Sequence, residues 1–512
     1  MRPPAWPEAA AAACRPNILS TLLSKSALLT VLLADPLAAL ETSLQRAPYV
    51  QNLGRNEVTI MWRTQTSVVQ TLEYGRTLAD MEHSWTESQP STNHEIRLTG
   101  LEPGALYYYR IVEDGLVRAA GPELRFHTDA GRGDTSFQFF VTADIGVHTP
   151  SDAFQFETQE MIRTLSPRAE FGLLAGDIVY PDGDSDRYDE VLMQPWAELL
   201  CNTPVWPALG NHDWQSDPEK NYVKEWALPN NEHYYSFDYG NAHFIALDTQ
   251  GGLFEEAQQL AWLEQDLASN TDATWTFVFF HHPLITCTYK GNEPGLAAQL
   301  TPLFEQYGVD MVFTGHAHTY ERLYPNRGGM ALHQEQDPNY HDPGAPIYVV
   351  SGCGGKVKRG EPTSYCGPTA FYLDERILFN QIYVRDHSLW MFTFHSLTGI
   401  AVDAMSIHKS PVPTDVGTPP RGARLLRTVP NPFNPATFVS FEVSTPTRVQ
   451  LDVYGMNGVW IRRLSARVYP RGSHRVLWSG DDAAGRPVAS GIYVIRMQND
   501  GVASTRKVTL LR

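Results

Sequence analysis

Residues 312–322 read Val-Phe-Thr-Gly-His-Ala-His-Thr-Tyr-Glu-Arg, a short apolar run that ends abruptly in two histidines. An apolar run of this kind predicts a buried strand. The His-x-His that follows it places two imidazoles, those of His316 and His318, at the end of that strand. Taken alone, such a pair is as often two ordinary loop histidines as a functional site.

The same pattern occurs at four places upstream. Four further apolar runs each lead into a side chain that could hold a metal: 137–141 into Asp144, 171–174 into Asp177, 205–209 into Asn211, and 276–280 into His281. Sites in open α/β sheets lie beyond the carboxyl ends of the strands. Chance would give one or two such coincidences, so the five runs predict one common site at a sheet edge.

Length and charge bound the possible classes of protein. A chain of 512 residues is long for one domain, and about three are expected. Its 42% hydrophobic and 11% aromatic residues are typical of a globular protein. The net charge of −17 argues against a general polyanion-binding surface, so no nucleic-acid partner is expected. A local cluster of metal ions would still bind phosphate, because local charge decides that.

The first forty residues resemble a targeting segment. Arg2, Arg15 and Lys25 precede the apolar run 26–33, and Ala38 and Ala39 supply small residues for cleavage. We therefore expect residues 1–40 to be a signal segment, and the protein to be secreted or held at the cell surface. No later stretch has the roughly 20 apolar residues that a membrane-spanning helix needs, so no transmembrane segment is expected.

Five cysteines are present, and Cys14 lies in the expected signal segment. The other four, Cys201, Cys287, Cys353 and Cys366, allow three disulfide pairings, among which the sequence does not choose. Because Cys353 and Cys366 share one Gly-rich loop, we favour a bond between them. Four buried thiols are the alternative.

Residues 45–130 predict a small β-sandwich. Val58, Ile60 and Trp62 alternate with polar neighbours, as in a half-buried strand. A Pro-Gly turn at 103–104 feeds a Tyr-rich strand, and the segment resembles a fibronectin type III module. It shows no catalytic cluster, so we expect it to have a packing and positioning role.

Residues 134–408 predict an α/β domain. Apolar strands alternate with expected helices at 154–165, 188–200, 254–267 and 296–307. The hairpin at 234–247 makes the sheet mixed, and strands at 346–350, 376–384 and 389–396 imply a second sheet. The predicted fold class is therefore an α/β sandwich.

The remainder of the chain predicts a linker and a second β domain. Residues 409–424 hold prolines at 411, 413, 419 and 420, as in an extended linker. Residues 425–512 return to β signals at 437–443, 449–454, 475–478, 492–497 and 507–511, with an Asn-Gly turn at 457–458. Two small all-β sandwich domains would then flank the α/β domain.

The side chains at the strand ends suit a pair of metal ions. Asp177 can offer one oxygen to each of two cations, and Asp144 supplies a second carboxylate. Asn211 supplies an amide oxygen, and the histidines supply imidazoles. Such mixed nitrogen and oxygen ligands suit iron, zinc or manganese. Two cations a few ångströms apart can clamp the attacking and leaving oxygens of an in-line phosphoryl displacement.

Five motifs together resemble those of the purple acid phosphatases, which belong to the calcineurin-like metallophosphoesterases. They are Asp144-Ile-Gly, Gly-Asp177-Ile-Val-Tyr180, Gly-Asn211-His212-Asp213, His281-His-Pro, and Gly-His316-Ala-His318-Thr-Tyr-Glu-Arg. The Ala47-Pro-Tyr-Val-Gln-Asn segment and its β module resemble the amino-terminal domain of the plant-type members. The resemblance covers roughly residues 45–408 and implies a four-layer α/β/β/α sandwich.

The resemblance also implies roles for the ligands. Generic metallophosphoesterases have Asp-x-His at the first motif, whereas Gly146 stands here in place of that histidine. Tyr180 would fill the open position as a phenolate, which favours Fe(III) and gives a purple colour. The implied set for Fe(III) is Asp144, Asp177, Tyr180 and His318. The implied set for a second metal, which is Zn, Mn or Fe, is Asp177, Asn211, His281 and His316.

Two further residues are expected to act on substrate. By resemblance, His212 is not a ligand and would bind phosphate oxygens or protonate the leaving alkoxide. Relatives commonly carry a second catalytic histidine beyond the His281 motif, where this chain has Lys290. An ammonium there still attracts phosphate, but with an ordinary pKa of about 10.4 it is a poorer proton donor. His282 is ambiguous and is expected to support the ligands.

The implied function is an exported, two-metal phosphomonoesterase, in which a metal-bound hydroxide attacks a small phosphate ester. A phosphodiesterase or nucleotidase on the same metals is a second possibility. A surface-binding protein with a vestigial metal domain is a third. The last domain resembles bacterial sorting and immunoglobulin-like modules, through Val429-Pro-Asn-Pro-Phe-Asn-Pro-Ala-Thr and Ala489-Ser-Gly-Ile-Tyr. That implies export through type IX-like secretion machinery, or attachment at the cell surface.

Overall fold

The computed structural model describes residues 44–510 except 134, 148–153, 219, 251–256, 333, 335–337, 358–366, 375, 411–422, 430–432, 434–435, 456–458 and 500–501. The chain divides into two compact units, Met1–Pro411 and Val412–Arg512. The expected signal segment, most of the expected linker and the expected Asn-Gly turn at 457–458 lie outside the described residues.

The amino-terminal β domain contains eight strands. They are β1 (Leu44–Gln51), β2 (Glu57–Val68), β3 (Thr71–Gly75), β4 (His83–Thr86), β5 (Ser91–Thr99), β6 (Leu106–Glu113), β7 (Leu116–Ala119) and β8 (Arg125–His127). One sheet has the order β1-β2-β5, and the other has the order β4-β3-β6-β7 with β8 beside β6.

Strand β2 differs from the predicted half-buried strand. Val58, Ile60 and Trp62 are buried, but Thr59 and Met61 between them are buried as well. The reason is that the second face of this sheet packs on the α/β domain. Buried Arg63 of β2 and Arg46 of β1 both pair there with Glu225, which is 0% exposed in the folded chain.

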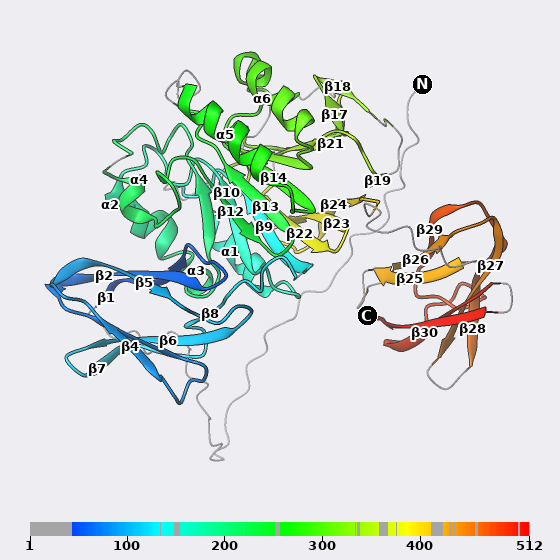
Figure 1. Ribbon diagram of the computed structural model, residues 1–512, viewed down its shortest axis with the longest axis horizontal. Coiled ribbons are helices and arrows are strands. Elements are labelled where there is room, and N and C mark those ends of the chain that lie inside the picture. Colours follow the sequence, from blue (N-terminus) through cyan, green and yellow to red (C-terminus); the bar gives the residue numbers. More distant parts are fainter. Residues whose placement is uncertain are drawn as a thin grey trace, which may run out of the picture. The chain divides into compact units, whose positions relative to one another are not determined.

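Two seven-stranded mixed sheets form the α/β domain (Figure 1). The first has the order β11-β10-β9-β22-β23-β24-β19. Its strands are β9 (Ser136–Thr142), β10 (Phe171–Ala175), β11 (Val205–Ala208), β19 (Asn339–His341), β22 (Leu378–Arg385), β23 (Ser388–His395) and β24 (Ala401–His408).

The second sheet has the order β12-β13-β14-β15-β20-β16-β21. Its strands are β12 (Tyr235–Tyr239), β13 (Ala242–Ala246), β14 (Trp275–Phe279), β15 (Met311–Thr314), β16 (Tyr320–Leu323), β20 (Ile347–Ser351) and β21 (Thr369–Leu373). A short hairpin, β17 (Asn326–Arg327) and β18 (Met330–Ala331), lies outside both sheets.

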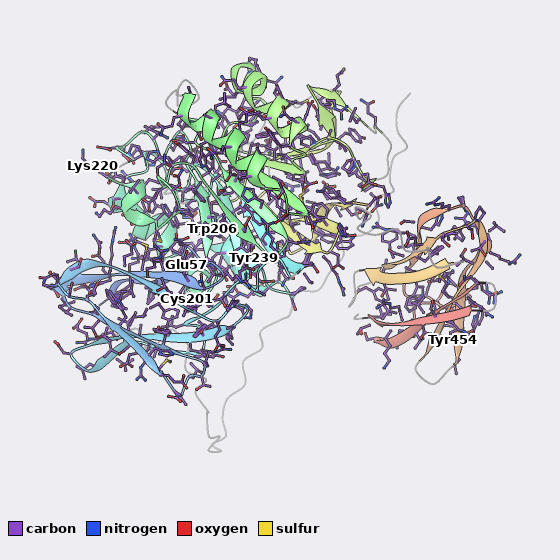
Figure 2. The ribbon with its side chains drawn as sticks, in the orientation of Figure 1. Glu57, Cys201, Trp206, Lys220, Tyr239 and Tyr454 are labelled. Atoms are coloured by element: carbon purple, nitrogen blue, oxygen red, sulfur yellow. The ribbon has the colours of Figure 1, made fainter. Side chains whose placement is uncertain are left out.

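An aromatic core joins the two sheets face to face. The ring of Phe139 in β9 meets those of Phe244 and Phe277 in the second sheet, at 5.2 Å between centroids in each case. Trp206 of β11 stacks on Phe237 of β12 at 3.8 Å, and its position can be followed in Figure 2. The predicted second sheet and the α/β sandwich are therefore confirmed.

The described residues of the α/β domain also form helices. They are α1 (Gln155–Thr164), α2 (Ser185–Tyr188), a π-helix η1 (Asp189–Met193), α3 (Ala197–Leu200), α4 (Tyr222–Glu225), α5 (Ala257–Ser269) and α6 (Pro294–Gln306). Leu263 of α5 and Leu300 and Phe304 of α6 form a buried cluster with Val278 and Val312 of the second sheet. Figure 1 shows α5 and α6 lying along this side of the strands.

One expected helix is wrong in form. Residues 188–200 do not form one helix but the end of α2, then η1 and α3. Pro195 lies between η1 and α3 and lacks the N–H that a continuous helix would use, so it divides the segment. Trp196 nevertheless stays fully buried and donates its indole N–H to the carbonyl of Gln155.

The carboxy-terminal unit is all β within its described residues. Its strands are β25 (Ala423–Val429), β26 (Thr437–Val443), β27 (Thr447–Gly455), β28 (Trp460–Tyr469), β29 (Gly472–Trp478), β30 (Gly491–Asn499) and β31 (Val502–Leu510). They form sheets of order β25-β26-β29 and β28-β27-β30-β31 around a core of its own. Strands β25 and β28 were not predicted, and β25 begins inside the expected linker.

The favoured disulfide is wrong. Cys353 is a free thiol, 1% exposed, and Cys201 is also free and buried. Cys287 is the disulfide-bonded cysteine, and its partner lies outside the described residues. Among the helices that are described, none has the length and apolar character to cross a membrane.

Candidate metal centre

The predicted ligands lie in tight turns at the ends of parallel strands. Asp144 follows β9, Asp177 follows β10, and His316 follows β15, and all three have positive φ angles of 57°, 51° and 68°. Parallel pairing of β9 with β10 and of β14 with β15 brings these ends to the same edges of the two sheets. Each turn redirects its side chain away from the strand, toward the space between the sheet edges.

A first group of oxygen and nitrogen atoms surrounds the hydroxyl of Tyr180. This hydroxyl lies 2.7 Å from Oδ1 of Asp144, 2.9 Å from Oδ2 of Asp177 and 3.2 Å from Nε2 of His318. His318 Nε2 is itself 3.3 Å from Asp144 Oδ1. These four residues are the set that the motif resemblance implies for Fe(III), and the structure brings them together.

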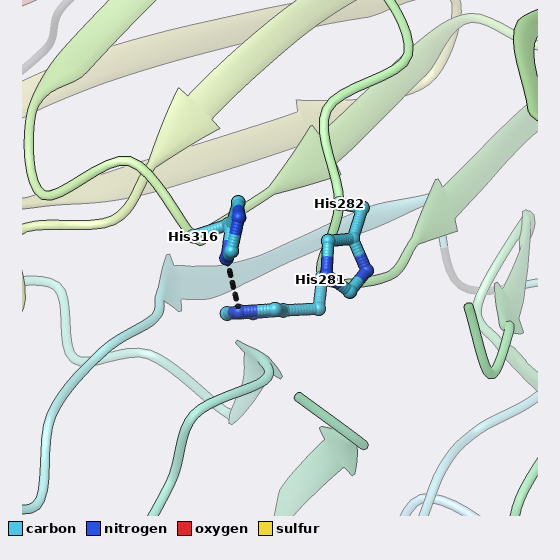
Figure 3. A group of neighbouring side chains, drawn as sticks. All are labelled: His281, His282 and His316. Carbon is cyan, nitrogen blue, oxygen red and sulfur yellow. Dashed lines mark hydrogen bonds between the residues drawn. The ribbon is translucent and has the colours of Figure 1, made fainter. Parts of the chain in front are cut away.

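A second group surrounds Nε2 of His281. This nitrogen lies 3.2 Å from Asn211 Oδ1 and 3.3 Å from Asp177 Oδ1. It also lies 3.2 Å from His316 Nδ1, the contact drawn as a dashed line in Figure 3. His281 Nδ1 donates to the carbonyl of Ala175 at 3.0 Å, which leaves the Nε2 lone pair pointing into the group. The two oxygens of Asp177 thus belong to different groups, as a bridging ligand requires.

The electrostatics of the two groups follow from burial and close packing of charge. Burial and the carboxylates of Asp144 and Asp177 raise the pKa of Tyr180 well above its usual range. Burial opposes ionisation of Asp177, but His281 and His212 hold its pKa below the usual range. Burial lowers the pKa of His281, but the adjacent Asp177 outweighs it and raises that pKa to about 9.

These atoms fit a pair of cations. The single hydroxyl proton of Tyr180 faces three acceptors and can be donated to one at a time. Likewise, Nε2 of His281 and Nδ1 of His316 lie 3.2 Å apart, and only one of the two nitrogens can donate to the other. A cation in each group would satisfy all the surrounding lone pairs at once. Such a cation also inverts the local pKa order, so that Tyr180 would bind it as a phenolate.

Glycines allow the turns to approach one another. A Cβ on Gly315 would stand 2.6 Å from Asp144 Oδ2, and a Cβ on Gly210 would stand 2.3 Å from Asp177 Oδ1. At Gly146 a Cβ would stand 2.2 Å from the carbonyl oxygen of Ile178. The structure therefore leaves no room at position 146 for the histidine of other metallophosphoesterases, and the Tyr180 hydroxyl lies against Asp144 instead.

Asp213 pins two ligand turns together, a role that sequence reasoning missed. Its buried carboxylate accepts from the N–H groups of Ile178 at 3.0 Å, Val179 at 3.2 Å and Gly210 at 2.9 Å. One carboxylate therefore connects the turn after Asp177 with the turn before Asn211. The aspartate of the Gly-Asn-His-Asp motif holds ligands in place rather than serving as one.

His212 and Lys290 lie beside the ligands. The ring of His212 packs on that of Tyr180 at 4.3 Å, and its Nε2 is 3.9 Å from Asp177 Oδ2. The Lys290 ammonium acts on His316: burial, His281, His282 and Lys290 together lower the pKa of His316 to about 2. His212 is therefore next to the predicted centre, and Lys290 lies near enough for its charge to act on His316.

Supporting contacts complete the surroundings. His282 packs on His316 at 4.6 Å between rings, and its Nδ1 lies 2.9 Å from Thr249 Oγ1. Its ligand atom also lies close enough to those of His281 and His316 for the three to hold a metal, so the expected supporting role stays a prediction. The Tyr289 hydroxyl accepts from the backbone N–H of His318 at 3.2 Å. The Lys356 ammonium lies over the Tyr180 ring. No motif in the sequence indicated Tyr289 or Lys356.

Two families of known proteins match parts of this sequence. Residues 137–320 match the family described as calcineurin-like phosphoesterase, and residues 47–128 match the purple acid phosphatase N-terminal domain. Purple acid phosphatase 21 of Arabidopsis thaliana is 28% identical over 283 residues, covering 51% of this chain and 58% of that protein. Acid phosphatase type 7 of Danio rerio is 26% identical over 293 residues, covering 51% and 64%.

A solved structure has the same fold. The purple acid phosphatase PPD1 from yellow lupin seeds aligns with a TM-score of 0.63 at 19% identity, covering 72% of this chain and 75% of that one. The α/β domain is thus a calcineurin-like phosphoesterase domain. It follows a purple acid phosphatase N-terminal domain in the chain, and the homologues of the chain are purple acid phosphatases. The chain spans less than two thirds of the length of the curated relatives it matches.

Proposed function

We propose that this chain is a phosphomonoesterase that acts through two metal ions, Fe(III) and a divalent Zn, Mn or Fe. The observation that carries the proposal is the division of seven side chains into two groups that share only Asp177, one oxygen in each. Fe(III) would take Asp144, Asp177, Tyr180 and His318. The divalent ion would take Asp177, Asn211, His281 and His316.

Two bound cations would neutralise phosphate oxygens and supply an activated water as nucleophile. The side chains around them bind and position the ester. His212 Nδ1 contacts the carbonyl of Pro181, so an Nδ1–H donated there leaves Nε2 directed toward substrate. From this place His212 would hold a phosphate oxygen or deliver a proton to the leaving group. Lys290 would attract the phosphate through its positive charge.

Hydrolysis of a chromogenic aryl phosphate, together with metal analysis, tests the proposal. We expect two metals per chain, a visible absorption band and turnover. Tyr180→Phe should lose the band and keep the fold, because it removes only the phenolate oxygen. Asp177→Asn should lose activity and at least one metal, because the bridging charge is gone. Asp217→Asn, which alters an exposed ion pair with Lys220, is the matched control and should change neither.

The same assay separates the alternatives. A protein that binds no metal and turns over no ester would be a binding protein with a vestigial centre, and the proposal would be wrong. Faster turnover of a bis-aryl phosphate diester than of the monoester would show a phosphodiesterase on the same metals. A colourless protein that contains Fe(III) would remove Tyr180 from the ligand set.

We also propose that the chain is exported, to be secreted or retained at the cell surface. The basic and apolar segment within residues 1–40 and the sorting-like carboxy-terminal domain support this. Fractionation of cells that express the whole chain, with and without residues 425–512, tests it. Retention of the whole chain in the cytoplasm would contradict the proposal.

A further inference from the structure

Lys356 is fixed to the predicted iron site by its backbone. It follows the loop after β20, where the N–H groups of Gly355 and Lys356 both donate to the carbonyl of Asp144, at 3.1 Å and 3.0 Å. The N–H of Gly354 donates to the adjacent carbonyl of Ala143 at 3.0 Å. Three successive donors thus tie this loop to the strand end that carries a ligand.

Close packing leaves that loop no alternative path. A Cβ on Gly354 would stand 2.0 Å from Thr142 Oγ1, and a Cβ on Gly355 would stand 2.0 Å from the carbonyl oxygen of Ile145. Only glycine allows the loop to lie this close to β9 and the turn after it. The Cα of Lys356 is consequently held in a constant position relative to Asp144.

From this position the Lys356 side chain reaches Tyr180. Its Nζ lies 3.8 Å from the centroid of the Tyr180 ring, well within the range of a cation–π contact. The hydroxyl of that ring is the atom surrounded by Asp144, Asp177 and His318. A second described lysine, Lys290, lies 6.0 Å from the ring of Tyr289 instead.

We propose that Lys356 is a positioning residue for the Tyr180 phenolate, which it holds through a cation–ring contact and whose electron donation to Fe(III) it weakens. The inference rests on the proposed function, because it requires Tyr180 to bind iron. A cation beside an aromatic ring is attracted to the ring face, and the attraction grows when the ring carries a negative charge. The contact is therefore strongest in the iron-bound form.

The colour of the iron site reports this contact directly. The visible band of an iron phenolate moves electron density from the ring to the metal. A cation at the ring stabilises the ground state, in which the ring is negative, more than the excited state, in which it is not. Lys356 therefore raises the transition energy. Removing its charge should move the band to longer wavelength without removing the iron.

The experiment compares the visible spectra of the iron-loaded whole chain and three variants. Lys356→Gln should shift the band to longer wavelength at unchanged iron content, and Lys356→Arg should restore it because the charge is kept. Lys290→Gln removes a cation near the same centre but not from the Tyr180 ring, so its shift should be smaller.

The outcomes separate the claim that Tyr180 binds iron from the claim that Lys356 acts on the Tyr180 ring. An iron-loaded wild type without any band would overturn the role of Tyr180, and the inference with it. A wild-type band that Lys356→Gln leaves in place would overturn the inference alone. An equal shift in Lys290→Gln would also overturn it, since any charge near the centre would then suffice. Loss of iron in Lys356→Gln that Lys356→Arg does not rescue would show a purely structural loop residue.

Discussion

Replacement of Gly146 by alanine should disable the centre by moving two ligands apart. The new Cβ would stand 2.2 Å from the carbonyl oxygen of Ile178 and 3.0 Å from Cγ2 of Val191, whereas ordinary contacts begin near 3.4 Å. Relief therefore requires a displacement of about 1 Å. The two backbone segments are also hydrogen bonded to each other. The N–H of Gly146 donates to the carbonyl of Ile178 at 3.0 Å, and the carbonyl of Gly146 accepts from the N–H of Tyr180 at 2.8 Å.

The displacement acts on the iron ligands on both sides of the contact. Asp144 lies two residues before Gly146, and Tyr180 two residues after Ile178. A misplacement of about 1 Å can cost roughly a hundredfold in rate, which corresponds to about 2.7 kcal/mol of transition-state stabilisation. Overpacking of this kind costs about 1–3 kcal/mol of stability. We therefore expect Gly146→Ala to fold, with a hundredfold lower turnover and a weaker iron band.

Turnover of an aryl phosphate, iron content and urea unfolding measure the three effects. Gly295→Ala is the matched control, because Gly295 lies in α6 with no heavy atom within 4 Å of the added Cβ. It should leave turnover unchanged and raise stability by about 0.5–1 kcal/mol. Wild-type turnover and iron content in Gly146→Ala would refute the packing argument, and with it the reason given for Tyr180 in place of a histidine.

Four further results are expected. His212→Ala should keep both metals and lose roughly a hundredfold in turnover, as for a lost general acid; metal loss would instead make His212 a ligand. Lys290→His should raise turnover of alkyl phosphates relative to aryl phosphates, because imidazolium donates a proton near neutrality; an unchanged ratio would exclude position 290 as the acid. Glu225→Gln leaves buried Arg63 without its charge partner and leaves Arg46 paired with Asp189 alone, so urea unfolding should show a loss of about 3–5 kcal/mol; a loss below 1 kcal/mol would contradict this. A chain ended after Pro411 should keep its turnover, since the carboxy-terminal unit has a separate core; an unfolded product would show dependence between the units.

The strand ends could be predicted from the sequence because an apolar run and a side chain that could hold a metal occur together at each of them. Each apolar run marks a strand buried on both faces, and parallel strands bring their carboxyl ends to one edge. Asp144 and Asp177 are placed by that rule alone, and the observed pairing of β9 with β10 follows it. Tyr180, which lies in a turn rather than at a strand end, was indicated only by the family resemblance, in which a histidine stands where this chain has Gly146.

Contacts between segments distant in the chain could not be predicted in this way. Lys356 reaches the centre only because its loop is hydrogen bonded to Asp144, more than two hundred residues earlier. The second buried face of β2 depends on Glu225 of another domain. The disulfide was placed by closeness in sequence, whereas Cys353 is packed in the core between the sheets. Periodicity and turn signals carry no information on such pairs.

The residue types at the three strained turns answer two requirements at once. A positive φ costs most side chains free energy, but Asn, Asp and His are several-fold enriched there. The turns after β9, β10 and β15 place Asp144, Asp177 and His316 at φ angles of 51° to 68°. Each is also a good metal ligand. A glutamate at 144 or 177 would keep the charge but would lack the tolerance for this backbone and would extend the carboxylate by one methylene. The Asp and His of these motifs are therefore set by the backbone of a sharp turn as well as by the chemistry of a cation.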